Sequence, residues 1–477
     1  MASHQALPPR TASSMFLIGL ITLSVIGCIW LFAGSLLLFF CGISAIASVF
    51  FFQKNVRVFS TKWVTITGFW YLAYLAMIVI PSYFVYSDNP GERAEVFLAA
   101  VHVTLLTVSL GIYGANKAMS FKTAEIQLYY DRPIELPRDM RGSFQNTLIW
   151  LLLALGLFAI HLAELKTVPF IYLIRNPGDF ETVTYLREDS FKLLNSPLIY
   201  FYGLLRSAGF PIIMMVTLGN WLLCKSGGWF AMLVIAFVSS VAYASLSAAK
   251  MPLTSLILLA FVFSFIIKRS RHRWRTLLAG ILAGTGIPFL FYMLLFYEGE
   301  KGGGESSLEA LEQVGVRLFY SPAEVVYWYF ELFPGDVGYL HGRSIGKFAW
   351  LMGWDYFNTP NYVGTRVFGG LETINANSAF IGDLNADFGI PGVILGGILV
   401  GFIMQLIQIH CLRQPKTILN VAIFCYLIFA FWLLHSTSIL VVLGSNGVLV
   451  VLLFQLLRRK MEPMSRKDAV RLASKRS

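Results

Sequence analysis

The sequence predicts an all-α protein that crosses a membrane many times. Of its 477 residues, 57% are apolar and only 13% are charged, and the mean hydropathy is +0.67. A soluble globular protein usually carries about 25% charged residues. The apolar residues also form uncharged stretches long enough for a helix to cross a hydrocarbon core of about 30 Å. These observations exclude a soluble enzyme, a DNA-binding protein and a secreted disulfide scaffold.

We expect about twelve transmembrane helices. The stretch 15–52 contains no charged residue, and because it is far longer than one span needs, it predicts two spans that fold near Gly34 and Ser35. Ten further apolar stretches each predict one span: 63–85, 95–115, 144–165, 198–221, 229–247, 251–267, 276–297, 389–411, 417–434 and 438–457.

The distribution of charge predicts that both termini are cytoplasmic. In that orientation the inner segments hold 25 of the 37 basic residues and only six of the 26 acidic residues. Lysine and arginine are concentrated on the cytoplasmic side of membrane proteins. The net charge of +11 is therefore explained by orientation and by attraction to anionic lipid headgroups, and we expect no nucleic-acid partner.

This topology divides the chain into four parts. Residues 1–297 hold the first nine spans, with a smaller outer loop at 166–197. Residues 298–388 form one large outer loop, residues 389–457 hold the last three spans, and residues 458–477 form a basic cytoplasmic tail. The large loop contains many aromatic residues, glycines and helix signals, so we expect it to be folded.

The large outer loop should contain two helices. The first begins at Ser306 in a capping box, and the second begins at Ser321, which is followed by a first-turn proline and by Glu324 at position N3. The second helix should end near Pro334. Arg317 would then lie one turn before a helix N-terminus, where a guanidinium suits a phosphate. Arg317 can equally well cap the end of the preceding helix.

Four other cations are further candidates for a phosphate site. Arg343 and Arg366 lie in glycine-containing, aromatic-flanked stretches, where a backbone can approach a ligand closely, although an exposed salt-bridge surface is the simpler explanation. Arg206 lies eight residues inside the sixth span, where a charge usually faces a bundle interior or a water-filled cavity rather than reaching to the interface. Lys250 begins the eighth span just before a proline, as an ordinary interfacial lysine does.

We expect no metal and no cofactor. The histidines do not combine with carboxylates at metal-ligand spacing, and the sequence lacks a phosphate-binding glycine loop and a hydrolase serine elbow. It also lacks the Asp-x-Asp cluster that holds a metal-bound nucleotide sugar.

The segment 377–397 resembles the closing motif of the bacterial oligosaccharide repeat unit polymerases, the O-antigen polymerase family. In that family an acidic residue precedes an aromatic-Asn-Phe-Gly stretch and a Gly-Val helix start. Asp383, Phe388 and Gly392 fall on these positions, and Asp387 stands where asparagine is more usual. The sequence Ala-Lys-Met-Pro at 249–252 and the arginine with its aromatic helix at 317–334 are also similar to family features, so the likeness covers about 245–410.

The resemblance implies a membrane glycosyltransferase with a fold of the GT-C type. It would join undecaprenyl-diphosphate-linked oligosaccharides into a surface polysaccharide, such as O-antigen of lipopolysaccharide, capsule or exopolysaccharide, on the outer face of the bacterial inner membrane. Its partners would be this lipid-linked oligosaccharide, membrane lipid and a chain-length regulator protein.

In this reaction a sugar hydroxyl attacks an anomeric carbon and the lipid diphosphate leaves. Cations can stabilise the leaving group without a metal. The candidate diphosphate ligands are Arg317, Arg366, Arg343, Arg206 and Lys250. A carboxylate or histidine would accept the hydroxyl proton. The candidate catalytic residues are Asp383, Glu324, His341 and Asp387. Aromatic residues of the loop, including Trp350, Trp354 and Tyr356, could stack on sugars, but an aromatic belt at the membrane interface explains most of them more simply.

Two other functions fit parts of the pattern. A ligase that transfers finished glycan to a different acceptor would look much the same at this level. Twelve spans with both termini inside also occur in secondary transporters of polysaccharide or of lipid-linked oligosaccharide, but those have matched halves, whereas the largest insert here lies outside between spans nine and ten.

A cysteine introduced at Gly303 should react with a membrane-impermeant thiol reagent from the outer face, because the charge distribution places 298–388 outside. Labelling of intact spheroplasts measures this. Reaction only after the inner face has been opened would reverse the topology and remove the outer-face chemistry with it.

Overall fold

The computed structural model describes residues 35–461, apart from 59, 61, 138, 177–178, 193–197, 249, 268–274, 276–277, 281, 284–285, 287–311, 313–314 and 370–374. Throughout this part the regular structure is helical, and a single isolated β-bridge joins Glu135 to Thr417. Eight helical segments are long and apolar enough to cross a membrane: Leu36–Asn55, Ile66–Asp88, Ala94–Ala118, Met140–Glu164, Ile199–Cys224, Gly227–Ser245, Phe380–Arg413 and Ile418–His435. The protein is an all-α, multi-pass membrane protein.

These eight segments coincide with eight of the predicted spans. The predicted span at 251–267 is a shorter apolar helix, α13 (Lys250–Ile267). The first span of 15–52, the stretch 276–297 for the most part, and the Ser306 capping box lie outside the described residues. A total of twelve spans stays a prediction.

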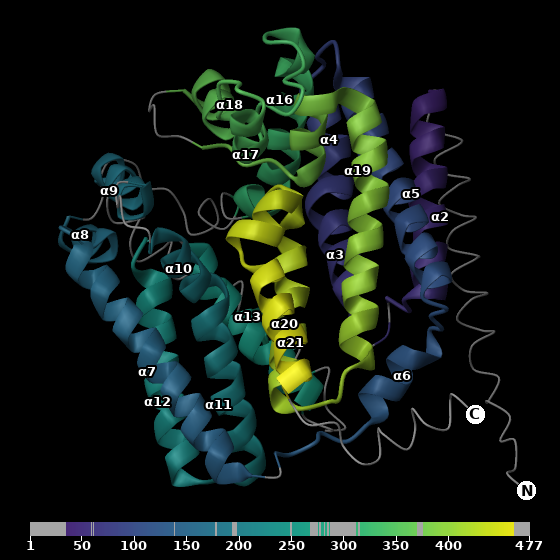
Figure 1. Ribbon diagram of the computed structural model, residues 1–477. Coiled ribbons are helices and arrows are strands. Elements are labelled where there is room, and N and C mark those ends of the chain that lie inside the picture. The colour runs from purple at the N-terminus through teal and green to yellow at the C-terminus, as the bar shows by residue number, and fades with distance from the viewer. Residues whose placement is uncertain are drawn as a thin grey trace, which may run out of the picture. The chain divides into compact units, whose positions relative to one another are not determined.

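The chain divides into two compact units, each built from two separate stretches. Unit 1 consists of Met1–Leu128 and Glu312–Arg413, and unit 2 consists of Tyr129–Leu311 and Gln414–Ser477. The helices of unit 1 (Figure 1) are α2 (Leu36–Asn55), α3 (Ile66–Tyr74), η1 (Leu75–Val79), α4 (Ile80–Asp88), α5 (Ala94–Ala118), most of α6 (Ala124–Asp131), η4 (Val316–Tyr320), α16 (Ser321–Gly335), α17 (Gly346–Leu351), α18 (Thr359–Phe368) and α19 (Phe380–Arg413).

Unit 2 contains the remaining described helices. They are α7 (Met140–Glu164), α8 (Pro169–Arg175), α9 (Phe180–Lys192), α10 (Ile199–Leu204), η2 (Leu205–Gly209), α11 (Phe210–Cys224), α12 (Gly227–Ser245), α13, α20 (Ile418–Trp432), η5 (Leu433–His435), η6 (Val441–Ser445) and α21 (Val448–Met461).

The centre of unit 1 is the contact between α5 and α19, which lie side by side (Figure 1). A Cβ atom added at Gly111 of α5 would lie 2.0 Å from the carbonyl oxygen of Ile398, and one added at Gly401 of α19 would lie 2.2 Å from the carbonyl oxygen of Val108. Gly397 is equally close to the side chain of Thr107. Only glycine fits at these positions, and it lets the two helix backbones touch.

Buried amide side chains join α3, α5 and α19. The side chain of Gln408 accepts hydrogen bonds from the backbone and hydroxyl of Thr67, each at 3.0 Å, and it donates to Gln405 at 3.1 Å. Gln405 in turn donates to the side-chain oxygen of Asn116 at 2.6 Å. In an apolar environment each unsatisfied amide would be costly, so these bonds specify how the three helices fit together.

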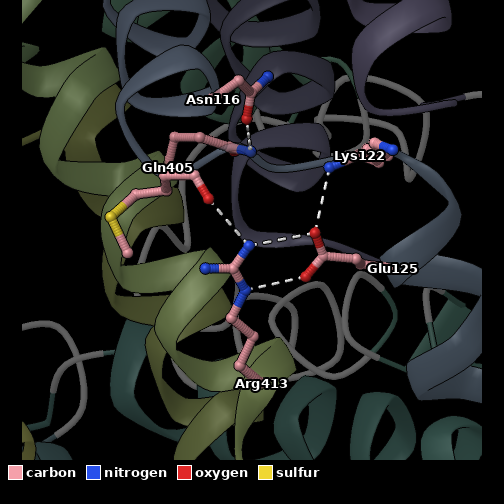
Figure 2. Close-up of polar contacts among 6 residues, drawn as sticks. Asn116, Lys122, Glu125, Gln405 and Arg413 are labelled. Carbon is pink, nitrogen blue, oxygen red and sulfur yellow. Dashed lines mark hydrogen bonds and ion pairs between the residues drawn. The ribbon is translucent and has the colours of Figure 1, made fainter. Parts of the chain in front are cut away.

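An ion pair connects the last residue of α19 to the segment that follows α5. Arg413, the last residue of α19, donates to both carboxylate oxygens of Glu125, at 2.9 and 3.1 Å, and to the carbonyl oxygen of Met119 at 3.0 Å (Figure 2). Met119 directly follows α5. Arg413 therefore ties the end of α19 to the carbonyl end of α5, where a positive charge is favourable.

Three helices contain a π-turn that ends two residues before a proline. The π-turns η1, η2 and η4 precede Pro81, Pro211 and Pro322. A proline inside a helix lacks an N–H group, and its ring clashes with the carbonyl oxygen four residues earlier. The wider π-turn accommodates the ring without ending the helix.

This arrangement corrects the predicted helix start at Ser321. The helix runs continuously from η4 into α16, and Ser321 makes no capping hydrogen bond. The predicted end is confirmed, because Phe333 and Pro334 have non-helical backbone angles. Pro322 therefore marks a π-turn rather than the first turn of a new helix.

Helix α19 consists of two parts. Gly389 has φ +65° and ψ −160°, a conformation that breaks the helix, and Pro391 follows it. Residues 390–413 can span about 35 Å at about 1.5 Å per residue, which is enough to cross a bilayer. Residues 380–388, the short arm of α19, extend beyond that span. The break coincides with the predicted boundary between the large loop and span ten.

The predicted helix at 438–457 is interrupted. Gly447 has φ +84° between η6 and α21, and the carbonyl oxygen of Asn446 accepts hydrogen bonds from the hydroxyl groups of Ser207 and Tyr426. Apolar composition alone did not reveal this break. The carbonyl oxygen of Asn446, which the break releases from the helix, is bound by residues that are distant in sequence.

Replacing Gly401 with alanine should destabilise the protein by about 1–3 kcal/mol, because the new methyl group would overlap the backbone of α5. Gly114→Ala is the matched control, since its added Cβ would meet only Phe402, at an ordinary 3.7 Å. Fluorescence-detected size exclusion after heating measures both unfolding midpoints. Equal midpoints would contradict the close contact between the helices.

Candidate functional site

The short arm of α19 holds the turn at 340–344 by several hydrogen bonds. Asp387 is only 3% exposed, and its carboxylate accepts from the backbone N–H groups of Gly342 and Ser344, at 3.0 and 3.3 Å, and from the Ser344 hydroxyl. The backbone N–H of His341 also donates to the Asp387 carbonyl oxygen at 2.9 Å. Asp387 thus has a structural role, which is to fix this turn.

Arg343 lies between the two residues that Asp387 binds. Its Nε donates to the carbonyl oxygen of Asp355 at 3.4 Å, and its guanidinium forms no other bond within the described residues. His341 is exposed and has φ +55°. The turn therefore presents Arg343 and His341 beside the short arm.

Asp383 lies one turn before Asp387 on the same arm. Burial, and then the negative charge of Asp383, raise the pKa of both Tyr329 and Tyr356. The Tyr329 hydroxyl donates to the carbonyl oxygen of Ala376 at 3.0 Å. Among the described residues, none donates a hydrogen bond to Asp383. Asp383 differs in this from Asp387, whose two oxygens are occupied by the turn.

A small hydrophobic core supports this arrangement. Asn385 on the short arm donates to the carbonyl oxygens of Tyr329 and Phe333, at 3.4 and 3.1 Å, and so attaches the arm to α16. The buried residues of this core are Tyr329, Leu332, Phe333, Leu340, Val363, Ala376 and Ala386. Figure 1 shows α16, α17 and α18 at the same end of unit 1 as the short arm.

The sequence did not single out Arg93, which positions α16. Its backbone N–H donates to Glu331 at 2.9 Å, and its guanidinium donates to the carbonyl oxygen of Phe333 at 3.2 Å. No motif surrounds Arg93, so only the fold reveals this contact. The loop between α4 and α5 thereby fixes the end of α16 that lies next to the short arm.

Two of the predicted phosphate ligands have different environments from those expected. Arg317 is exposed on η4 and does not precede a helix N-terminus, because the helix continues into α16. Arg366 lies 3.2 Å from Asp336, and its side chain is 64% exposed. The contact between Arg366 and Asp336 is a surface ion pair, the simpler explanation that the sequence offered for this arginine. Such pairs contribute about 0–1 kcal/mol to stability.

Among the described residues, no hydrogen bond or charge interaction joins Glu324 to Asp383. Glu324 lies in the first turn of α16, five residues before Tyr329, and no described residue donates a hydrogen bond to it. Partial burial raises the pKa of Glu324. Of the four predicted catalytic residues, the structure therefore brings together Asp383, Asp387 and His341.

Unit 2 has cations of its own. Arg206 in η2 donates to the hydroxyl of Ser247 at 3.3 Å, and Arg187 of α9 donates to the carbonyl oxygen of the same residue at 3.1 Å. Lys250 begins α13 shortly afterwards. Sequence reasoning missed Arg187, because the neighbouring acids at 188–189 make it look like part of a solvated helix face.

In the described part of the chain, no three histidine, cysteine, aspartate or glutamate side chains gather closely enough to hold a metal ion. Comparison with family models, with curated proteins and with solved structures finds no match. The likeness to the polymerase family therefore rests on the sequence motifs quoted above.

Replacing Asp387 with alanine should loosen the 340–344 turn, because it removes the acceptor of all three hydrogen bonds. The loss of a buried acceptor costs about 1–3 kcal/mol, or roughly 5- to 150-fold in local opening. Hydrogen exchange of the peptide containing Gly342 and Ser344 measures this. Asp336→Ala, the same change at an exposed position, should leave that peptide unaffected, and unaltered exchange in both variants would remove the structural role of Asp387.

Proposed function

We propose that this protein is a glycosyltransferase that polymerises undecaprenyl-diphosphate-linked oligosaccharides on the outer face of the bacterial inner membrane. Two groups support the proposal, one on the short arm of α19 and one on the turn that this arm holds. Asp383 has a carboxylate that accepts no hydrogen bond from the described residues, and Arg343 stands on a turn that the next carboxylate, Asp387, fixes in place.

The two groups match the two halves of the reaction. Asp383 accepts the proton of the acceptor sugar hydroxyl as that oxygen attacks the anomeric carbon of the growing chain. The bond between the anomeric carbon and the diphosphate breaks, and its electron pair leaves with the lipid diphosphate. Arg343 offers a planar, permanently charged guanidinium to the developing negative charge.

The depth of these residues supports a lipid diphosphate as the substrate. The break at Gly389 marks the start of the span, and Asp383 and Asp387 lie within two helical turns of it. A diphosphate attached to a membrane lipid lies at the same interface. With the topology predicted from charge, this end of α19 faces outward.

The other candidates have smaller parts in the proposal. Asp387 is a positioning residue, since its oxygens are occupied by the turn. His341 is exposed beside the site and can bind the acceptor sugar. Arg317 is an exposed cation of unit 1, and Arg366 would have to leave Asp336 to bind phosphate. Arg206 and Lys250 belong to unit 2. Arg206 stays a candidate diphosphate ligand because of its depth in the predicted span, and Lys250 stays one because of the family resemblance.

Purified protein in liposomes should convert a lipid-linked repeat unit into a ladder of longer glycans without nucleotide sugar, ATP or divalent cation. The energy for each step is stored in the sugar-diphosphate bond. Asp383→Asn should lower the rate by about 10²–10⁴-fold, the usual contribution of a general base. Arg343→Lys should also lose activity, because lysine cannot form a bidentate contact.

Glu95→Gln, a carboxylate-to-amide change at an exposed position of α5, is the matched control and should retain the wild-type rate. If a chelator abolished the ladder and magnesium restored it, the arginine mechanism would be incomplete. If single units crossed the vesicle membrane and no ladder formed, the protein would be a transporter. Transfer of finished glycan to a second acceptor, with no elongation, would make it a ligase.

A further inference from the structure

The turn at 340–344 is called the Arg343 turn below. The residues that follow it form an exposed apolar surface on and beyond α17. We call it the α17 patch, and its residues are Phe348, Trp350, Leu351, Met352, Trp354 and Tyr356. Trp350 is 82% exposed and Leu351 is 72% exposed. Exposed apolar groups of this size, gathered in one short segment, usually mark a surface that is covered in the working protein.

The α17 patch is attached to the outer end of a membrane span. Ser344 is bonded to Asp387, and α17 begins two residues later at Gly346. A Cβ atom added at Gly342 would lie 2.7 Å from Phe348 and 3.6 Å from Phe388, so both rings flank the same turn. Phe388 is 43% exposed and is the last residue before the break in α19. The patch therefore lies beside the residue that directly precedes the break at which the span begins.

The chemistry of the patch fits a bilayer interface. Tryptophan and tyrosine rings are enriched at the level of the lipid headgroups, because one end of each ring is apolar and the other is polar. Leu351 and Met352 add aliphatic surface, which favours the start of the acyl chains. Lys347, exposed on the same short helix, can meet a lipid phosphate.

A sugar would fit this surface less well. Glycans stack on the flat faces of aromatic rings, and the two adjacent residues Leu351 and Met352 offer no such face. We propose that the α17 patch inserts into the outer interface of the bilayer and holds the Arg343 turn at the depth of the lipid headgroups. This inference does not depend on the reaction that the protein catalyses.

Spin labels on full-length protein in phosphatidylethanolamine and phosphatidylglycerol liposomes test the proposal. Leu351→Cys and Trp350→Cys place labels in the patch, and Thr365→Cys places one on an exposed position of α18. Protein without an added cysteine, labelled in parallel, gives the background. Oxygen, which concentrates in the bilayer, and a water-soluble nickel complex are the two relaxation agents.

The patch labels should be relaxed by oxygen and lose access to the nickel complex, at a depth of about 5–10 Å, whereas the Thr365 label should be relaxed by nickel. In detergent-free nanodiscs the same pattern is expected. Equal nickel access at all three positions would overturn the proposal. Protection of positions 350 and 351 only after a soluble oligosaccharide is added would also overturn it and make the patch a glycan platform.

Discussion

The contact between α5 and α19 determines where everything else in unit 1 lies. Two helices in a lipid environment gain little from the hydrophobic effect when they associate, so their attraction depends on close van der Waals contact and on hydrogen bonds. Gly111 and Gly401 provide the first, and the bond between Gln405 and Asn116 provides the second. Because α19 is held in this way, its short arm projects from a fixed base, and the arm in turn holds α16 and the Arg343 turn.

A proline in this protein can begin a helix or follow a π-turn, and the local sequence does not distinguish the two. A Ser-Pro pair followed by an acid is typical of a helix start, yet Pro322 lies in the middle of a continuous helix and follows a π-turn. Pro81 and Pro211 follow π-turns in the same way. Two of the predicted phosphate ligands, Arg206 and Arg317, are each the second residue of such a turn. The extra backbone room of a π-turn depends on packing around the helix, which a short sequence window does not contain.

The fold class could be predicted because a bilayer imposes long apolar helices on any chain that crosses it. The segment that carries the candidate site could be predicted as well, from the motif around Asp383 and Asp387. The difference between these two carboxylates could not. It depends on Gly342 and Ser344, which lie more than 40 residues earlier and donate to only one of them. The pairing that occupies Arg366 likewise depends on a residue 30 positions away.

The discontinuous build of unit 1 has a consequence for biosynthesis. Helix α5 enters the bilayer early, but its partner α19 is encoded after the whole first stretch of unit 2. Until the ribosome has passed Arg413, the glycine face of α5 and the amide of Asn116 lack the neighbours that they have in the finished protein. Lipid, or a membrane insertase, must accommodate that face during translation. Unit 1 therefore assembles late, and the interval before α19 arrives is when the nascent chain is most open to misassembly and proteolysis.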